Sequence, residues 1–144
     1  MKKILISACL LGKGCRYDGK SKPNRDALEI ASRCELFPVC PEVLGGLPTP
    51  RNPSEICGDR VLMVDGTDVT AQYKLGAEKA LEIARKNGCC AAILKARSPS
   101  CGKGAVYDGT YSGTLKKGNG ITAQLFIENG IDVFDETEIG KIEL

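Results

Sequence analysis

Three of the eight cysteines each end an apolar run and stand before a loop rich in glycine, proline and polar residues. Cys9 ends the run ILISAC, Cys40 ends ELFPVC, and Cys101 ends AAILKARSPSC. Apolar runs of this kind are typical of buried strands in an α/β sheet, and such sheets bind ligands outside the carboxyl ends of their strands. We therefore expect the three thiols to converge on one point. Three convergent thiolates indicate a metal or iron–sulfur site with one open position.

The chain contains no histidine. This excludes Ser-His-Asp and Cys-His catalysis and zinc sites built on imidazole. Proton transfer in any reaction would then need a carboxylate, lysine, tyrosine, cysteine or bound water. Glu42 is the candidate, because it follows Cys40 by two residues and a partly desolvated carboxylate beside such a site suits proton transfer. The alternative is an exposed loop glutamate that only meets water.

Other polar residues lie on the same loops. Ser98 and Ser100 precede the third cysteine, and their hydroxyls can bind substrate or developing charge, or can simply cap a turn. The cations and the aromatic ring of Arg16, Tyr17 and Arg51 can form a wall for a planar ligand. They can equally anchor the loops through salt bridges, and the sequence does not decide between these functions.

Any single cysteine has a simpler explanation, because cysteine is among the residue types most often buried as a small core side chain. A fold without metal, in which the cysteines are core residues, is therefore one alternative. Cys15 is a second complication, since it lies six residues after Cys9 on the same predicted loop. It can serve as a spare ligand, a sulfur-handling thiol or a packed residue.

Composition and charge narrow the class of protein. With 144 residues, 42% of them hydrophobic and 26% charged, the chain is typical of one globular domain spanning residues 1–144. The net charge of +2 gives no strong electrostatic footprint for nucleic acid. No apolar run approaches the ~20 residues that a membrane helix needs, and charged residues soon follow the short N-terminal run. We therefore expect a cytoplasmic protein that does not bind a membrane.

The apolar pattern alternates between strand and helix signals. Strands are predicted at residues 4–8, 36–39, 60–64, 89–94 and 131–134, and helices at residues 25–33, 69–86 and 122–128. Asn24 is expected to cap the first helix, and Thr67 or Asp68 the longest one.

This order predicts an α/β fold: a single compact domain with a mostly parallel, Rossmann-like sheet, flanked by helices on both faces. Long loops are expected at the carboxyl ends of the strands. Residues 40–55, which contain four prolines, are predicted to be neither helix nor central strand. Residues 96–120 show no clear period, and residues 135–144 are predicted to form a frayed tail.

Four segments, in this order, resemble the thiouracil desulfidase family: SACLLG at residues 7–12, RYDG at 16–19, CPEVLGGLPTPR at 40–51 and SPSCG at 98–102. The resemblance implies a compact α/β fold with a [4Fe–4S] cluster that three cysteines hold, the remaining iron being free for the sulfur of the substrate. Transferred to this chain, the ligands would be Cys9, Cys40 and Cys101. The catalytic acid/base and the serine of the site would be Glu42 and Ser98.

The resemblance also implies the activity, which is non-redox desulfuration of a thiolated pyrimidine base or nucleoside of the 2-thiouracil or thiouridine type. The substrate would bind through its sulfur, and the sulfur would leave as sulfide. Two alternatives remain open at this point: a non-catalytic iron–sulfur or zinc protein that passes sulfur or electrons, and the fold without metal. The expected partner is a small molecule, and the oligomeric state is left open.

Overall fold

Four short parallel strands form the central sheet of the molecule. The computed structural model describes residues 1–21 and 23–144, and it places these strands in the order β2-β1-β5-β8. Their bounds are Glu35–Val39 for β2, Lys3–Ser7 for β1, Ala91–Ile93 for β5 and Asp132–Phe134 for β8. All three pairings are parallel, which confirms the predicted sheet. Ile4, Leu5 and Ile6 of the central β1 are completely buried, as expected for a strand covered on both faces.

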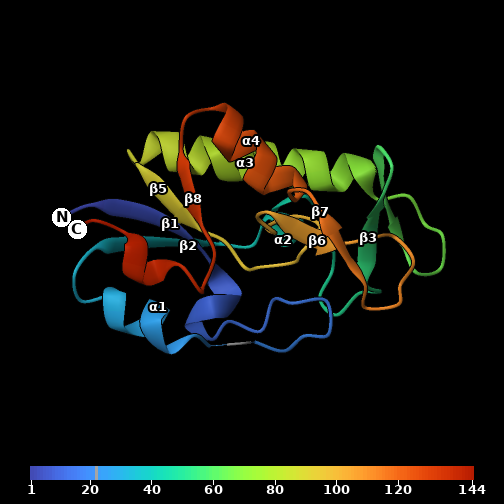
Figure 1. Cartoon of the computed structure of the whole chain (residues 1–144), viewed down its shortest axis with the longest axis horizontal. Helices are drawn as coiled ribbons and strands as arrows, with labels where there is room; N and C mark the ends of the chain where they lie inside the picture. The colour runs from blue at the N-terminus through green and yellow to red at the C-terminus, as the bar shows by residue number, and fades with distance from the viewer. Residues whose placement is uncertain (22) are drawn as a thin grey trace.

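Helices cover both faces of the sheet. On one face, α3 (Thr70–Lys86) and α4 (Ile121–Glu128) pack against Leu5 of β1. On the other face, α1 (Arg25–Ile30) and two 3₁₀ turns, Ala8–Leu11 and Ile139–Lys141, pack against Ile4 and Ile6. Figure 1 shows α3 and α4 together on one side of the sheet and α1 on the other. The alternation of side chains along β1 therefore divides the core into two layers.

The predicted cap of α1 is confirmed, whereas the predicted cap of α3 is wrong, because the N-cap position of α3 is Val69 and its side chain makes no capping hydrogen bond. The side chain of Asn24 accepts a hydrogen bond of 3.0 Å from the Ala27 N–H and caps α1. Asp68 Oδ1 accepts a bond of 2.9 Å from the Thr70 N–H at the first residue of α3. In the described part of the chain, no helix combines the length and the apolar character needed to cross a membrane.

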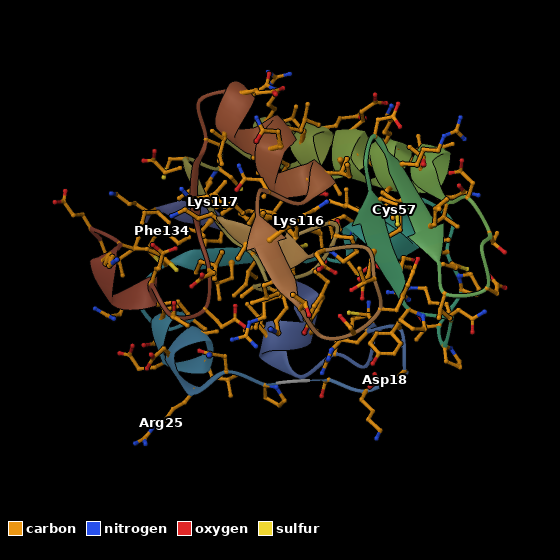
Figure 2. The ribbon with its side chains drawn as sticks, turned by 45° about the vertical axis from the view of Figure 1, so that its right-hand side comes forward. Asp18, Arg25, Cys57, Lys116, Lys117 and Phe134 are labelled. Carbon is orange, nitrogen blue, oxygen red and sulfur yellow. The ribbon has the colours of Figure 1, made fainter. Side chains whose placement is uncertain are left out.

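Two hairpins extend the molecule beyond the carboxyl ends of the parallel strands (Figure 1). The first consists of β3 (Ser54–Cys57) and β4 (Arg60–Met63), and the second of β6 (Ala105–Tyr107) and β7 (Leu115–Lys117). They contact each other, because Lys116 Nζ donates a 3.3 Å hydrogen bond to the carbonyl of Ile56. Figure 2 labels Lys116 and Cys57 on these neighbouring hairpins.

Three predictions about the loops and the tail are wrong. Residues 40–55 include a single-turn helix, α2 (Pro41–Leu44), which proline tolerates because it stands at the first helical position. Residues 96–120 include the β6–β7 hairpin, whose three-residue strands are too short to give a period. The tail of residues 135–144 is not frayed throughout, because its 3₁₀ turn places Ile139 in the core. The predicted strand at 89–94 is also shorter, beginning only at Ala91.

Two glycines let α2 lie directly against α3. A Cβ atom on Gly76 of α3 would lie 1.9 Å from the carbonyl oxygen of Pro41, and one on Gly45 would lie 1.9 Å from that of Gln72. Only glycine permits this approach, since backbone atoms cannot move aside as a side chain can. The contact fixes α2, and with it the residues around Cys40, against the longest helix.

The two ends of the chain meet at the opposite end of the molecule from the hairpins (Figure 1). The Lys2 side chain donates a hydrogen bond to the backbone carbonyl of Glu143. The chain ends therefore lie away from the carboxyl ends of the strands.

Candidate active site

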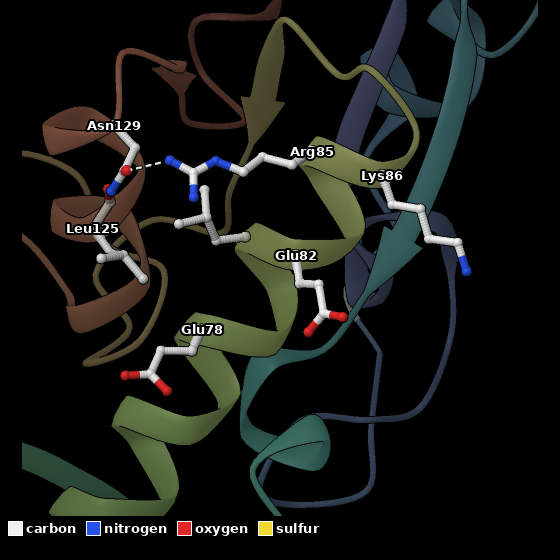
Figure 3. A pocket seen from close by; sticks show the side chains of 7 residues that line it. Glu78, Glu82, Arg85, Lys86, Leu125 and Asn129 are labelled. Atoms are coloured by element: carbon white, nitrogen blue, oxygen red, sulfur yellow. Dashed lines mark hydrogen bonds between the residues drawn. The ribbon is translucent and has the colours of Figure 1, made fainter.

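Two hollows on the surface of the described residues differ in character. A groove of about 720 Å³ runs between α3 and α4 (Figure 3), where Arg85 donates a hydrogen bond to Asn129. It is lined by Glu78, Leu81, Glu82, Arg85, Lys86, Leu125 and Asn129, so it contains no thiol. A second cavity, of about 360 Å³, lies at the carboxyl ends of the parallel strands and contains the predicted residues. We therefore take the second cavity as the candidate site.

Four cysteines line this cavity. Cys9 follows β1 and Cys40 follows β2, whereas Cys101 lies on the loop after β5, well beyond the strand end at Ile93. All three nevertheless line the same cavity, as predicted. Cys15, on the loop after β1, lines the same cavity. The four thiols come from three segments of the chain, because Cys9 and Cys15 both lie between β1 and α1.

The thiols are held in place by neighbouring polar groups. The Cys101 thiol lies 3.5 Å from Ser7 Oγ, and the Cys40 thiol donates to the Cys15 carbonyl at 3.7 Å. Burial raises the pKa of the Cys101 thiol to about 12. Hydrogen bonding with Cys15, together with burial, raises the pKa of Cys40. For Cys15, the bond with Cys40 lowers the pKa, but the bond with Cys9 and burial outweigh it and the pKa is raised.

The donor set fits an iron–sulfur cluster. Thiolates are the usual ligands of such clusters, and each thiol must release its proton when it binds a metal. Among the residues that the structure describes, no three Cys, Asp or Glu side chains gather closely enough to hold one metal ion. A structural zinc ion would need its thiolates about 2.3 Å from a single centre, whereas a cluster distributes its cysteines over several irons. Four thiols around one cavity, in a chain without histidine, match the thiolate donor set of such a cluster.

Glu42 is held between a tyrosine and an arginine. It is the second residue of α2, lines the cavity, and its side chain is 19% exposed. Tyr73 on α3 donates a hydrogen bond to Glu42 Oε1, and Arg51 Nη2 lies 3.4 Å from Oε2. Burial, and then the negative charge of Glu42, raise the pKa of the Tyr73 hydroxyl, so it remains a donor. The carboxylate thus has a fixed orientation toward the cavity.

Ser98 lines the cavity and also caps its own turn. Its Oγ accepts hydrogen bonds of 3.0 Å from the N–H groups of Ser100 and Cys101. The structure therefore confirms the turn-capping function, which was one of the two possibilities for Ser98. The same hydroxyl lies next to the backbone of Cys101, the third cysteine. Ser100 lies behind the lining, where its hydroxyl bonds to Thr122 at 2.8 Å and the residue is completely buried.

Arg16 and Tyr17 line the cavity, but Arg51 does not. The Arg51 side chain is 2% exposed, and its Nη2 donates a 3.1 Å hydrogen bond to the Cys15 carbonyl. Its Nη1 donates a bond of the same length to the carbonyl of Pro48. Arg51 therefore fastens the Cys15 loop and the segment after α2 to Glu42, which is the loop-anchoring function that the sequence left open.

Several residues of the site were not predicted. Lys95 lies just after β5, where its position at a strand end could have identified it, and its Nζ pairs with Glu136 Oε2 at 2.7 Å. Arg97 lines the cavity with a left-handed backbone φ of 71°, which is uncommon for a residue other than glycine. Glu55 and Tyr107 reach the cavity from the two hairpins, whose positions no local pattern indicates.

Comparison with known proteins agrees with this geometry. The 2-thiouracil desulfurase family matches residues 4–138. The uncharacterized protein YbbK of Bacillus subtilis (strain 168) is 39% identical over 149 residues, an alignment that covers 96% of this chain and 99% of YbbK. A solved structure, the [4Fe-4S]-dependent thiouracil desulfidase TudS, is 46% identical with a TM-score of 0.89, covering 98% of this chain and 95% of TudS. The chain therefore belongs to the 2-thiouracil desulfurase family.

Proposed function

We propose that this protein is a [4Fe–4S]-dependent desulfidase that replaces the sulfur of a thiouracil-type pyrimidine with oxygen. The observation that carries this proposal is the presence, in one cavity, of several strand-end cysteines and an oriented glutamate. The 46% identity with a [4Fe-4S]-dependent thiouracil desulfidase supports it, and it does not favour a non-catalytic sulfur or electron carrier. We assign Cys9, Cys40 and Cys101 as the cluster ligands.

The reaction converts a thiocarbonyl and water into a carbonyl and hydrogen sulfide, without net oxidation or reduction. When bound, the cluster supplies a Lewis-acidic iron suited to a soft thiocarbonyl sulfur. Glu42 takes a proton from the attacking water and returns it to the departing sulfur. Tyr73 and Arg51 keep the Glu42 oxygens in position for both transfers. Ser98, on the loop that carries Cys101, positions the substrate or the water.

The substrate is a small thiolated base or nucleoside. The cavity volume of about 360 Å³ lies near the lower end of the range for small-molecule sites, ~300–1,000 Å³. The cluster would take up part of this volume, which favours a single-ring base. Arg16 and Tyr17 line the cavity and are proposed to contact the ring, whereas Arg51 and Ser100 support the loops from behind.

We further propose that residues 1–144 act as one unit in the cytoplasm. All eight cysteines belong to the described part of the chain, and none of them is paired in a disulfide there. A reducing compartment keeps cysteines in this state.

The test is anaerobic reconstitution followed by turnover. The reconstituted protein is expected to bind about four irons per chain. Incubation with 2-thiouracil should then release sulfide and uracil in equal amounts, measured by a colorimetric sulfide assay and by chromatography. A protein that holds its iron but releases no sulfide from 2-thiouracil or a thiouridine would contradict the proposal.

A further inference from the structure

Glu55 brings a second carboxylate to the cavity, from a hairpin and not from a loop at the end of a parallel strand. It belongs to β3 of the first hairpin, lines the cavity and is 8% exposed. Charged residues are seldom buried to this degree unless something binds them. Its position therefore calls for partners on both carboxylate oxygens.

Within residues 1–21 and 23–144, only one of these oxygens has hydrogen-bond partners. Oε1 accepts hydrogen bonds from two backbone N–H groups of the β6–β7 loop, 2.9 Å from Gly109 and 3.1 Å from Tyr111. Among the described residues, Oε2 accepts no hydrogen bond and forms no ion pair. Among the described residues, Arg51 Nε is the one fully buried side-chain nitrogen or oxygen atom without a hydrogen-bond partner. Because Glu55 Oε2 also lacks a partner but is not such an atom, it is not fully buried. Oε2 therefore keeps some exposed surface, and the residue that carries it lines the cavity.

This free acceptor is distinct from the carboxylate already assigned to proton transfer. Both oxygens of Glu42 face protein partners, Tyr73 on one side and Arg51 on the other. Glu55 Oε2 has no such partner in the described residues and is not adjacent in sequence to any cavity cysteine. It is therefore placed to bind a group of the substrate rather than to move a proton.

A thiopyrimidine offers a matching donor. Its ring carries N–H groups next to the thiocarbonyl, and a carboxylate that accepts from such a group makes a charge-assisted hydrogen bond. We propose that Glu55 is a specificity-determining residue whose Oε2 accepts a ring N–H of the substrate. This inference rests on the proposed desulfidase function and adds a requirement to it: the substrate must have an unsubstituted ring nitrogen at that position.

The same side chain links substrate binding to the shape of the cavity. By holding Gly109 and Tyr111, Oε1 fixes the loop that joins β6 and β7. Tyr107 and Gly113, at either side of that segment, also line the cavity. A purely structural function of Glu55 would act through this loop alone and would affect every substrate equally, which separates the two explanations experimentally.

The test compares 2-thiouracil with its 1-methyl and 3-methyl derivatives in the wild type and in Glu55→Gln, both loaded with cluster. Glutamine keeps the size of the side chain and an acceptor for the loop, but it presents an N–H₂ group where Oε2 stands. For 2-thiouracil, kcat/KM is expected to fall about 10- to 100-fold, the range for one hydrogen bond to a charged group. For the derivative methylated at the contacted nitrogen, kcat/KM should stay within about threefold of the wild-type value, because that bond is already absent.

Two further measurements exclude indirect effects. Iron content and thermal midpoint should match between Glu55→Gln and the wild type, and the affinity for uracil, measured by calorimetry, should fall by a factor similar to that for kcat/KM. Asp108→Asn is the matched control, because Asp108 Oδ1 binds Thr110 in the same loop at 3.0 Å without lining the cavity. This control should keep the wild-type preference for the unmethylated base.

The outcomes separate the two proposals. If the wild type turns over 2-thiouracil but Glu55→Gln lowers kcat/KM equally for all three bases, or for none, the function of Glu55 as a specificity residue is overturned and the desulfidase proposal stands. If the loaded wild type releases no sulfide from any thiopyrimidine, both proposals fail.

Discussion

The hydroxyl of Tyr73 on α3 donates a hydrogen bond to Glu42 on α2, so a group from one helix orients the carboxylate of another. Arg51 approaches the same carboxylate from the loop that follows α2. The proton-transfer group of the proposed reaction is therefore positioned by tertiary contacts and not by its own single-turn helix. This arrangement makes the contribution of each partner measurable.

Replacing Tyr73 by phenylalanine should lower kcat while leaving the fold intact. Phenylalanine keeps the buried ring but removes the donor, so Glu42 loses one of the two groups that orient it. We expect kcat for 2-thiouracil to fall about tenfold or more, with a smaller change in KM. Steady-state kinetics checks this. The matched control is Tyr111→Phe, whose hydroxyl bonds to the Leu62 carbonyl outside the cavity. An unchanged kcat in Tyr73→Phe would contradict the positioning function.

Replacing Glu42 by glutamine should separate catalysis from cofactor binding. The amide is similar in size but cannot take a proton from water, so we expect kcat to fall by a factor of about 10²–10⁴. The iron content should remain that of the wild type, since Glu42 is not a proposed ligand. Glu29→Gln, on the exposed surface of α1, is the control. Full activity in Glu42→Gln would remove this residue from the mechanism.

Four cysteines line the cavity, but only three are proposed as ligands of the cluster. The iron content of cysteine variants shows which three bind it. We expect Cys40→Ser to lose most of its iron and its activity, and Cys15→Ser to retain the cluster. Cys34→Ser is the control, since Cys34 is buried below the sheet and bonds to the Ile30 carbonyl. Iron analysis and the visible absorption of anaerobically purified variants provide the readout. The reverse result would exchange Cys15 for Cys40 as a ligand.

Replacing Gly76 by alanine should destabilise the protein, although alanine normally favours a helix over glycine. The new Cβ would meet the Pro41 carbonyl oxygen at 1.9 Å and force α2 away from α3. We expect the free energy of unfolding to fall by about 1–3 kcal/mol and cluster retention to decrease. Urea denaturation measures the first and iron analysis the second. Gly140→Ala is the control, because a Cβ there meets nothing within 4 Å. Equal stability of both variants would show that the helix contact adjusts freely.

The ion pair between Lys95 and Glu136 should give a pH-dependent contribution to stability. Burial alone would raise the pKa of Glu136, but Lys95 and the Ala96 N–H outweigh it and hold the pKa below its ordinary value of 4.5. A lowered folded-state pKa means that the contribution is complete above 4.5 and is lost as the pH falls through the folded-state pKa.

Glu136→Gln should therefore lower the free energy of unfolding at neutral pH by about 1–3 kcal/mol. The difference from the wild type should shrink on acidification below pH 4.5. Urea denaturation over a pH series checks this, with the exposed Glu82→Gln as control. A difference that does not depend on pH would rule out the charge of Glu136 as its source.

The sequence predicts those parts of the fold that depend on local pattern. The apolar run of β1 and the Asn24 cap of α1 are confirmed, because both act over a few consecutive residues. Helix α2 was missed, since prolines obscure a helix whose packing depends on Gly45 meeting α3, a residue pair distant in sequence. The β6–β7 hairpin was missed because each of its strands has only three residues.

The candidate site, like the fold, could be predicted from the sequence only in part. The presence of Cys9, Cys40 and Cys101 in one cavity was predictable, because the segments that follow neighbouring parallel strands lie at one edge of the sheet. Glu55 was not predictable, since it reaches the cavity only because the hairpins fold over the strand ends. The sequence also could not show which residues line the cavity and which only support its loops. Nothing in the sequence predicts that Arg51 lies behind the cavity wall.

The meeting of the chain ends has a practical consequence for handling the protein. Lys2 and Glu143 lie together at the end of the molecule away from the hairpins and the strand ends that bear the cavity (Figure 1). An affinity tag, a fluorescent reporter or a surface linker fused at either terminus is therefore directed away from the cavity mouth. The protein can be immobilised under anaerobic conditions by either end with its thiols still accessible to iron and to small molecules.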